Sequence, residues 1–351
     1  MAKSRLVVNT AALVVLVVLL AAMAANAEGV LLRYKFVPQQ ELAYDFWMVG
    51  TGGMDIAGLP LAPEQGEMPG HLQMQLEGNA SFSLPVTAVD EQGNGTLGLE
   101  MGPLAMQMQA MGRSFHMAMD LTKGTVKVDG ESIQMPEGPM QQMLPSFENL
   151  SWTISPRGKL VAISGLEELL TGGAGMPQMP MFANMADFQK LLKEMPAWLP
   201  EDPVAVGDSW DMQVPLPLPG MGADPLPEFA IKYTLEGLGE IDGHRIARIG
   251  FEGVLEGANL AVPMPGGPAQ QQREVAEEGR QPDYMNMALT ETVDGQIYFD
   301  LDAGQMHSVR GNVAIDVSMG VPLPAQAGEE AGKPLAMQMG MNLHFVVSPA
   351  L

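Results

Sequence analysis

Strict alternation of apolar and polar residues runs through long stretches of this 351-residue chain and limits most strongly what it can fold into. Every second residue from Leu72 to Val86 is apolar or small, and most of the residues between them are polar. Successive side chains of a β-strand point to opposite faces, so the pattern predicts a strand with one buried face. The stretch is far longer than a typical strand of about 5–6 residues, which predicts a wide, curved sheet.

The C-terminal third carries the same pattern in three long runs, at residues 285–301, 309–319 and 335–347. We expect these runs to form an antiparallel meander with one apolar face.

Shorter alternating runs predict two hairpins in the N-terminal half. Residues 32–36 and 42–48 would pair around a short turn. Residues 152–155 and 159–163 flank Pro156-Arg157-Gly158, where proline presets one turn dihedral and glycine permits a positive one.

One segment, Asn184 to Met195, has helical periodicity. Asn184 can cap the helix, and Pro196 ends it because the residue before a proline is disfavoured in the helical region. One face of the segment is apolar and consists of Met185, Phe188, Leu191, Leu192 and Met195. The predicted fold class is therefore mainly β: a large curved antiparallel sheet or half-open barrel, with one amphipathic helix packed on it.

Residues 1–27 have the features of a secretory signal peptide. Two basic residues precede a 15-residue apolar stretch from Ala11 to Ala25, and Ala25-Asn26-Ala27 fits a cleavage site. An uncleaved membrane anchor is the alternative, but it requires about 20 apolar residues. We expect residues 28–351 to form a single β-rich domain in two halves, 28–170 and 200–351, joined by a loop and helix crossover at 171–199.

The net charge and the lack of cysteine disfavour or exclude several classes of binding partner and site. The chain has 41 acidic and 18 basic residues, a net charge of −23, which disfavours binding to nucleic acids and to anionic membranes. It has no cysteine, which excludes disulfides, thiolate metal sites and a cysteine nucleophile. These features predict a soluble protein exported to the bacterial periplasm or beyond the cell, not an integral membrane protein once the signal is cleaved. An outer-membrane barrel should show aromatic girdles, which the predicted strand ends lack.

Methionine is unusually frequent, with 30 residues. On the predicted strands methionine alternates in step with Leu, Phe and Val, so it belongs to the apolar face. Its unbranched side chain adapts there to varied shapes. An apolar small molecule or lipid could lie between this face and the predicted helix. The residues predicted to line that cavity are Met185, Phe188, Leu192, Met287, Met337, Met339 and Met341.

Two other functions stay open. Thioethers select soft ions, so a Cu(I) or Ag(I) site is possible in the loop and helix segment, with Met176, Met179, Met181 and Met185 as ligands. A structural or protein-interaction module with a filled core would need no ligand. The chain has no G-x-S-x-G, H-E-x-x-H or P-loop motif, so we expect neither enzymatic activity nor a cofactor. The sequence does not predict an oligomeric state.

Four short stretches carry a resemblance to a known family: Leu32 to Phe36, Ile154 to Lys159, Leu199 to Trp210 and Gly295 to Asp300. With these stretches in this order, the chain resembles a family of secreted bacterial β-rich proteins of unknown function, similar to half-barrel carriers of lipoproteins and lipids. The resemblance implies export and a β-rich body. It assigns no functional residues.

Overall fold

The protein is mainly β, with one large antiparallel sheet. The computed structural model describes residues 29–57, 71–110, 112–120, 125–134, 149–165, 194–215, 228–263, 284–321 and 335–350. Residues 1–27, the predicted signal peptide, lie outside these ranges.

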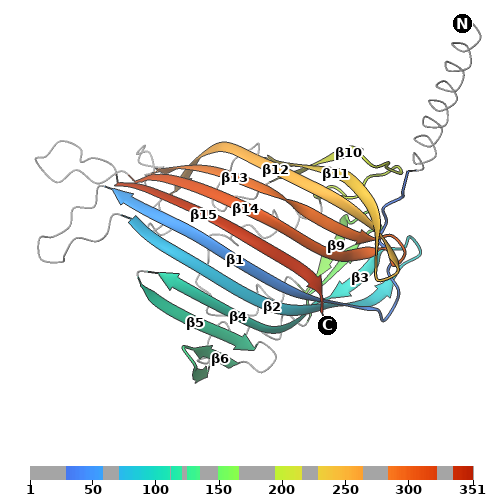
Figure 1. Ribbon diagram of the computed structural model, residues 1–351, viewed down its shortest axis with the longest axis horizontal. Helices are drawn as coiled ribbons and strands as arrows, with labels where there is room; N and C mark the ends of the chain where they lie inside the picture. Colours follow the sequence, from blue (N-terminus) through green and yellow to red (C-terminus); the bar gives the residue numbers. More distant parts are fainter. Residues whose placement is uncertain are drawn as a thin grey trace, which may run out of the picture.

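The strands of the main sheet lie side by side in an order that brings the two halves of the chain together (Figure 1). That order is β10 (Ser209–Pro215), β11 (Glu228–Ile241), β12 (His244–Pro263), β13 (Tyr284–Asp300), β14 (Gln305–Val321), β15 (Leu335–Pro349), β1 (Glu41–Ala57), β2 (His71–Val89), β4 (Glu100–Ala110), β5 (Arg113–Asp120), β6 (Thr125–Val128) and β7 (Glu131–Gln134). The sheet is not closed, because it ends at β10 on one side and at β7 on the other.

The predictions of a large antiparallel sheet and of a C-terminal meander are confirmed. β13, β14 and β15 pair consecutively and cover the three long alternating runs. β1 pairs with β15 on one side and with β2 on the other, so the first long strand completes the meander of the last three.

A small second layer covers one end of the sheet. It contains β3 (Gly95–Gly98), β8 (Ser151–Ile154) and β9 (Leu160–Ser164), and β3 connects it to β2. The predicted turn between β8 and β9 is confirmed, with Gly158 at a φ of 75°. A Cβ on Gly158 would lie 2.3 Å from the Trp198 indole, so this position also lacks space for a larger residue.

The predicted opening hairpin is wrong. Residues 31–37 form no strand, and Val30 instead makes an isolated bridge with Val204 through backbone hydrogen bonds of 2.8 and 3.0 Å. The reason is that both edges of β1 are occupied, by β15 and β2. Leu32 therefore packs into the core, where it is fully buried.

The predicted helix from Asn184 to Met195 lies outside the described residues except at its last two positions. Glu194 is helical and Met195 is not. None of the helical residues that the structure describes belongs to a helix long and apolar enough to cross a membrane.

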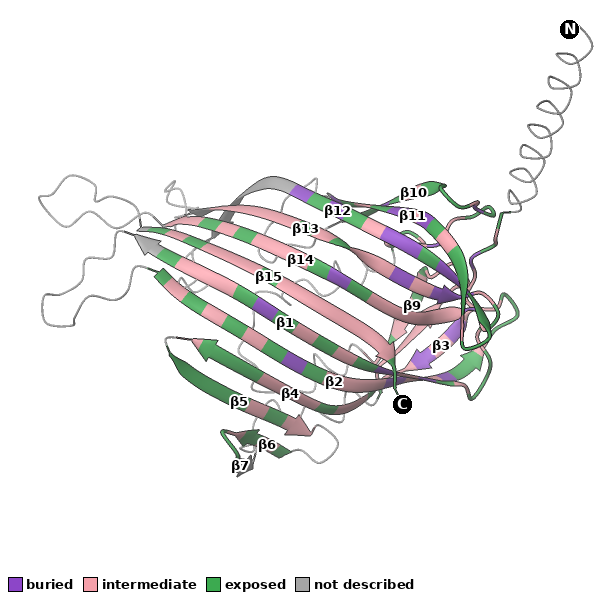
Figure 2. Cartoon of the chain, viewed as in Figure 1, coloured by how far each residue is buried: buried purple, intermediate pink, exposed green. Residues whose placement is uncertain are grey.

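Two clusters of buried side chains lie at the end of the sheet that the second layer and the N-terminal segment cover. The first consists of Leu32, Leu199, Val204, Met212, Tyr233, Leu235, Ala247, Ile249, Ile297 and Phe299. The second consists of Leu42, Tyr44, Val86 and Leu97. Figure 2 shows most of the buried segments at the right-hand end, with intermediate and exposed residues alternating along the rest of the long strands.

Candidate functional site

The side of the main sheet that carries both core clusters, here called the apolar face, is the candidate site. Five adjacent strands place the apolar residues of their alternating pattern on this face: β13, β14, β15, β1 and β2. At one end the face is buried by the core clusters. Toward the other end its side chains are half-buried, including Val293, Val313 and Leu343 on three neighbouring strands.

Methionines gather on the half-buried part of the apolar face. Met319 on β14 stands opposite Met287 on β13 and opposite Met337 on β15. One step along, Met339 on β15 stands opposite Met54 on β1. Side chains directly opposite each other in antiparallel strands have Cβ atoms about 4.5–5.5 Å apart, so these thioethers are neighbours.

The structure brings together four of the predicted cavity residues, Met287, Met337, Met339 and Met341, on β13 and β15. The other three, Met185, Phe188 and Leu192, lie outside the described residues, as do the proposed metal ligands Met176, Met179 and Met181. The alternation did not reveal Met54 and Met319 as their neighbours, because this requires the register between strands.

Some positions on the face are glycines, which leave space above the backbone. Flexible side chains from neighbouring strands occupy that space. A Cβ on Gly50 would stand 2.4 Å from Leu343, and a Cβ on Gly78 would stand 3.0 Å from the terminal methyl of Met48. Long aliphatic and thioether chains thus occupy space that a larger residue would fill. Such chains can move with little cost, which suits the face to apolar molecules of varied shape.

One charged residue interrupts the apolar face. Glu291 of β13 lies on the same face of the strand as Leu289 and Val293, and it is half-buried. Apart from the Tyr44 phenol, every other side chain at this parity is apolar or a glycine in the described stretches of β13, β15, β1 and β2, and in β14 from Val309 onward, beyond the bulge opposite Tyr298 and Phe299. Glu291 is not among the residues predicted from the sequence, although a single acidic residue within an otherwise apolar alternation is the signal that identifies it.

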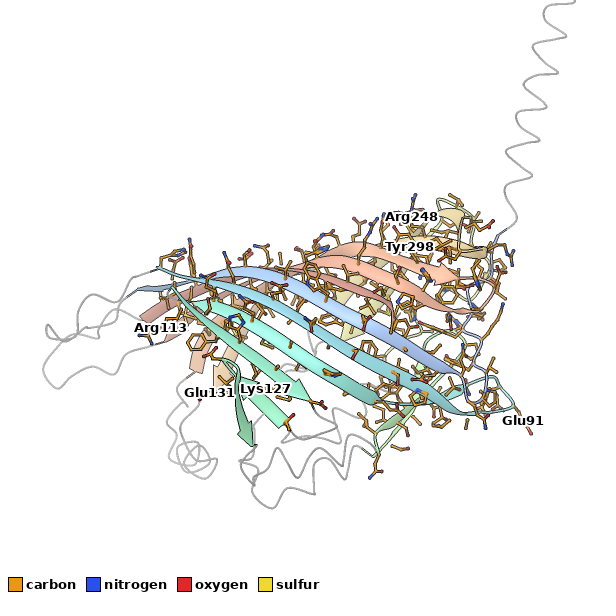
Figure 3. The ribbon with its side chains drawn as sticks, turned by 60° about the horizontal axis from the view of Figure 1, so that its bottom comes forward. Glu91, Arg113, Lys127, Glu131, Arg248 and Tyr298 are labelled. Carbon is orange, nitrogen blue, oxygen red and sulfur yellow. The ribbon has the colours of Figure 1, made fainter. Side chains whose placement is uncertain are left out.

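The opposite face of the sheet is polar and carries a network of side chains across four strands. Arg248 contacts Glu236 at 3.0 Å, and Gln296 donates a hydrogen bond to the same carboxylate at 2.9 Å. A shallow depression of about 700 Å³ lies over this network. Figure 3 labels Arg248 and Tyr298 near the upper border of the sheet. Exposed pairs of this kind contribute little stability, so this face is a solvated surface.

Neither face gathers, from the described residues, the acidic and histidine side chains that a hard metal ion would need. Those residues contain no group of three His, Asp or Glu side chains placed to hold a metal ion. Burial raises the pKa of Tyr44 and of Tyr233 to about 12, which keeps both phenols neutral beside the apolar face.

No protein-family model matches this chain, and no curated protein matches its sequence. Among solved structures, two from Pseudomonas aeruginosa are similar to it at 8% identity and a TM-score of 0.19 each, OpdQ and OccK11 (OpdR). The OpdQ match covers 89% of this chain and 100% of OpdQ, and the OccK11 match covers 91% of this chain and 98% of OccK11. Likeness at that level carries no argument about function. The fold defines an open antiparallel β-sheet protein with one apolar face, and membership of the secreted family stays a prediction.

Proposed function

We propose that this protein is exported to the bacterial envelope, where it binds an apolar small molecule or lipid without catalysing a reaction. The observation that carries the proposal is the set of methionines on adjacent strands of the half-buried apolar face, with Met319 opposite both Met287 and Met337, and Met54 opposite Met339. Transferring apolar area from water to such a surface stabilises a complex by roughly 25 cal/mol per Å².

The dimensions of the face suit a ligand with an alkyl chain. Neighbouring strands lie about 4.8 Å apart, so five strands span about 19 Å between the first and the last. Methionine and leucine side chains adapt to alkyl chains of different length and branching. This favours a ligand defined by its apolar character over one defined by a specific shape.

The proposal includes the amphipathic helix that begins at Asn184 and ends at Glu194, packed on this face, with Phe188 and Leu192 facing the ligand. The position of the following residues supports it. Trp198 packs in the first core cluster, with its ring centroid 5.8 Å from that of Tyr233, and its carbonyl accepts a 2.7 Å hydrogen bond from Trp210 Nε1. The residues that follow the segment therefore lie on the apolar side of the sheet.

Native mass spectrometry after mild purification tests the proposal. We expect wild-type protein to carry additional mass, and organic extraction to release an apolar compound. Met54→Gln and Met339→Gln should each reduce the bound fraction, because an amide on this face disfavours contact with an alkyl chain. The matched control is Gln338→Glu, next to Met339 but exposed on the polar face. Protein that always emerges as bare chain and takes up no added alkyl compound would refute the proposal.

A second candidate function is soft-metal binding, and the strand register favours a location for it. Met54 with Met339 and Met319 with Met337 are directly opposed pairs, so two thioethers can converge on one ion in each. Competition against a Cu(I) chelator distinguishes the possible sites. Changing Met176, Met179, Met181 and Met185 to Leu removes the predicted loop site, whereas changing the four strand methionines to Leu removes the sheet site. Wild-type protein that does not compete excludes both.

A further inference from the structure

Glu291 is a single acidic residue among aliphatic side chains of the apolar face. Its register partners are Leu255 on β12 and Ile315 on β14, and its neighbours along β13 at the same parity are Leu289 and Val293. All four are aliphatic. Leu255 is only 4% exposed, so the carboxylate stands beside a well-buried side chain.

The half-buried Glu291 carboxylate still contacts water, because no buried side-chain oxygen of the described residues lacks a hydrogen-bond partner, but a ligand that covers it would displace that water. Removing it from water costs free energy unless an opposite charge or hydrogen-bond donors replace the lost hydration. In the part of the chain that the structure describes, Glu291 has no hydrogen bond or ion pair to another residue. The cations of the nearby strands, such as Arg248 and Arg310, engage Glu236 and Gln296 of the polar network and not Glu291.

We propose that Glu291 binds the basic nitrogen of an amphiphilic ligand whose alkyl chain lies along the methionines of the apolar face. This inference rests on the proposed function and names its ligand class, a cationic amphiphile. A positively charged nitrogen supplies both the missing charge and hydrogen-bond donors, and Met341, two strands away in the same rung, continues the apolar path. An anionic headgroup would instead place two like charges together.

The negative net charge of the chain also favours cationic over anionic ligands. At −23 the protein attracts cations from solution and repels anions over distances set by ionic strength. This long-range attraction requires no particular residue, so the test must separate it from binding at Glu291.

Two probes of equal chain length test the inference: decylamine, which is cationic at pH 7, and decanol, which is neutral. Titration calorimetry below their aggregation concentrations measures the affinity of each for wild-type protein, Glu291→Gln and Asp316→Asn. Glu291→Gln keeps the shape of the side chain and removes its charge. Asp316 is exposed, pairs with Thr290 and has the parity of the polar face, so Asp316→Asn removes one charge from the opposite face.

We expect wild-type protein to bind decylamine about tenfold more tightly than decanol, as one charge-assisted contact permits. Glu291→Gln should abolish that preference and leave decanol binding unchanged, whereas Asp316→Asn should keep the preference. Equal binding of both probes by wild-type protein overturns the inference without any variant. A preference that survives Glu291→Gln, or that Asp316→Asn also removes, overturns it as well, because the net charge then accounts for it.

The two proposals fail separately. If wild-type protein binds decanol and decylamine equally, apolar-ligand binding stands and the role of Glu291 is rejected. If it binds neither probe, the proposed function is refuted, and the assignment of Glu291 falls with it.

Discussion

Phe251 of β12 covers Gly295 of β13: a Cβ on Gly295 would lie 2.5 Å from the end of the Phe251 ring. The same ring would lie 3.0 Å from a Cβ on Gly311 of β14. These residues share one rung of the sheet, Phe251 opposite Gly295 and Gly295 opposite Gly311, so the aromatic side chain spans two strands that carry no side chain there. The close approach requires glycine at both positions.

Gly295→Ala should therefore destabilise the protein. The added methyl group would also meet the Arg310 carbonyl oxygen at 2.3 Å, and backbone atoms of a central strand cannot move aside easily. We expect a loss of about 1–3 kcal/mol, the usual cost of overpacking, measured by urea denaturation. Gly320→Ala on β14 is the control, since a Cβ there would contact nothing within 4 Å. Equal stability of the two variants would contradict the role of Phe251.

The decrease in the free energy of unfolding at alkaline pH should depend on the ionisation of Tyr44 and Tyr233. Burial raises the pKa of each to about 12 from an ordinary value of 10.0, so the folded state retains protons that the unfolded state loses. Their contribution is complete below pH 10 and is lost as the pH rises toward 12, by about 1.4 kcal/mol per pH unit for each group. Denaturation series at pH 9 to 11.5 measure the slope. Tyr44→Phe and Tyr233→Phe should each make it shallower, and wild-type slopes in both variants would contradict the prediction.

The sheet could be predicted from the sequence because alternation over more than ten residues fits a long strand and excludes a helix. The position of β1 in the sheet could not be predicted, because alternation indicates which side chains share a face but not which strands pair with each other. Residues 32–36 show this directly: they alternate like a strand, yet β1 pairs with residues from the far end of the chain and leaves Leu32 to pack in the core.

The same limit applies to the candidate site. Parity places Met287 and Met339 on one face, so it could be predicted without a structure that the four strand methionines share that face. Met54 and Met319 required the register, which depends on side-chain packing across strands. Glu291 could have been found as an exception to the pattern, but its aliphatic surroundings emerge only from the register with β12 and β14.

Arg33 should hold the N-terminal segment against the core. Its guanidinium donates a 2.6 Å hydrogen bond to the Pro200 carbonyl and another to the Glu201 carbonyl, and so joins two segments that are distant in the sequence. Arg33→Met retains the aliphatic stem and removes both bonds. We expect a loss of about 1.5–3 kcal/mol in the free energy of unfolding. Arg113→Met, at an exposed strand start, should change it by less than about 0.5 kcal/mol.

Asp300 should stabilise the turn between β13 and β14 through its hydrogen bonds more than through its charge. The Asp300 side chain is 6% exposed, and one of its oxygens accepts hydrogen bonds of 2.8 Å from the backbone N–H groups of both Asp302 and Ala303. The other oxygen lies 3.0 Å from Nδ1 of His244, a largely exposed side chain.

Asp300→Ala leaves both N–H groups without their acceptor and should cost about 2–3 kcal/mol. Asp300→Asn keeps an acceptor oxygen for them and gives up only the interaction with His244, so it should cost less than about 1 kcal/mol. Urea denaturation of both variants at pH 7.5 decides between the two contributions. If Asp300→Asn were as unstable as Asp300→Ala, the interaction with His244 would be the larger contribution, and the hydrogen bonds to the turn would be the smaller one.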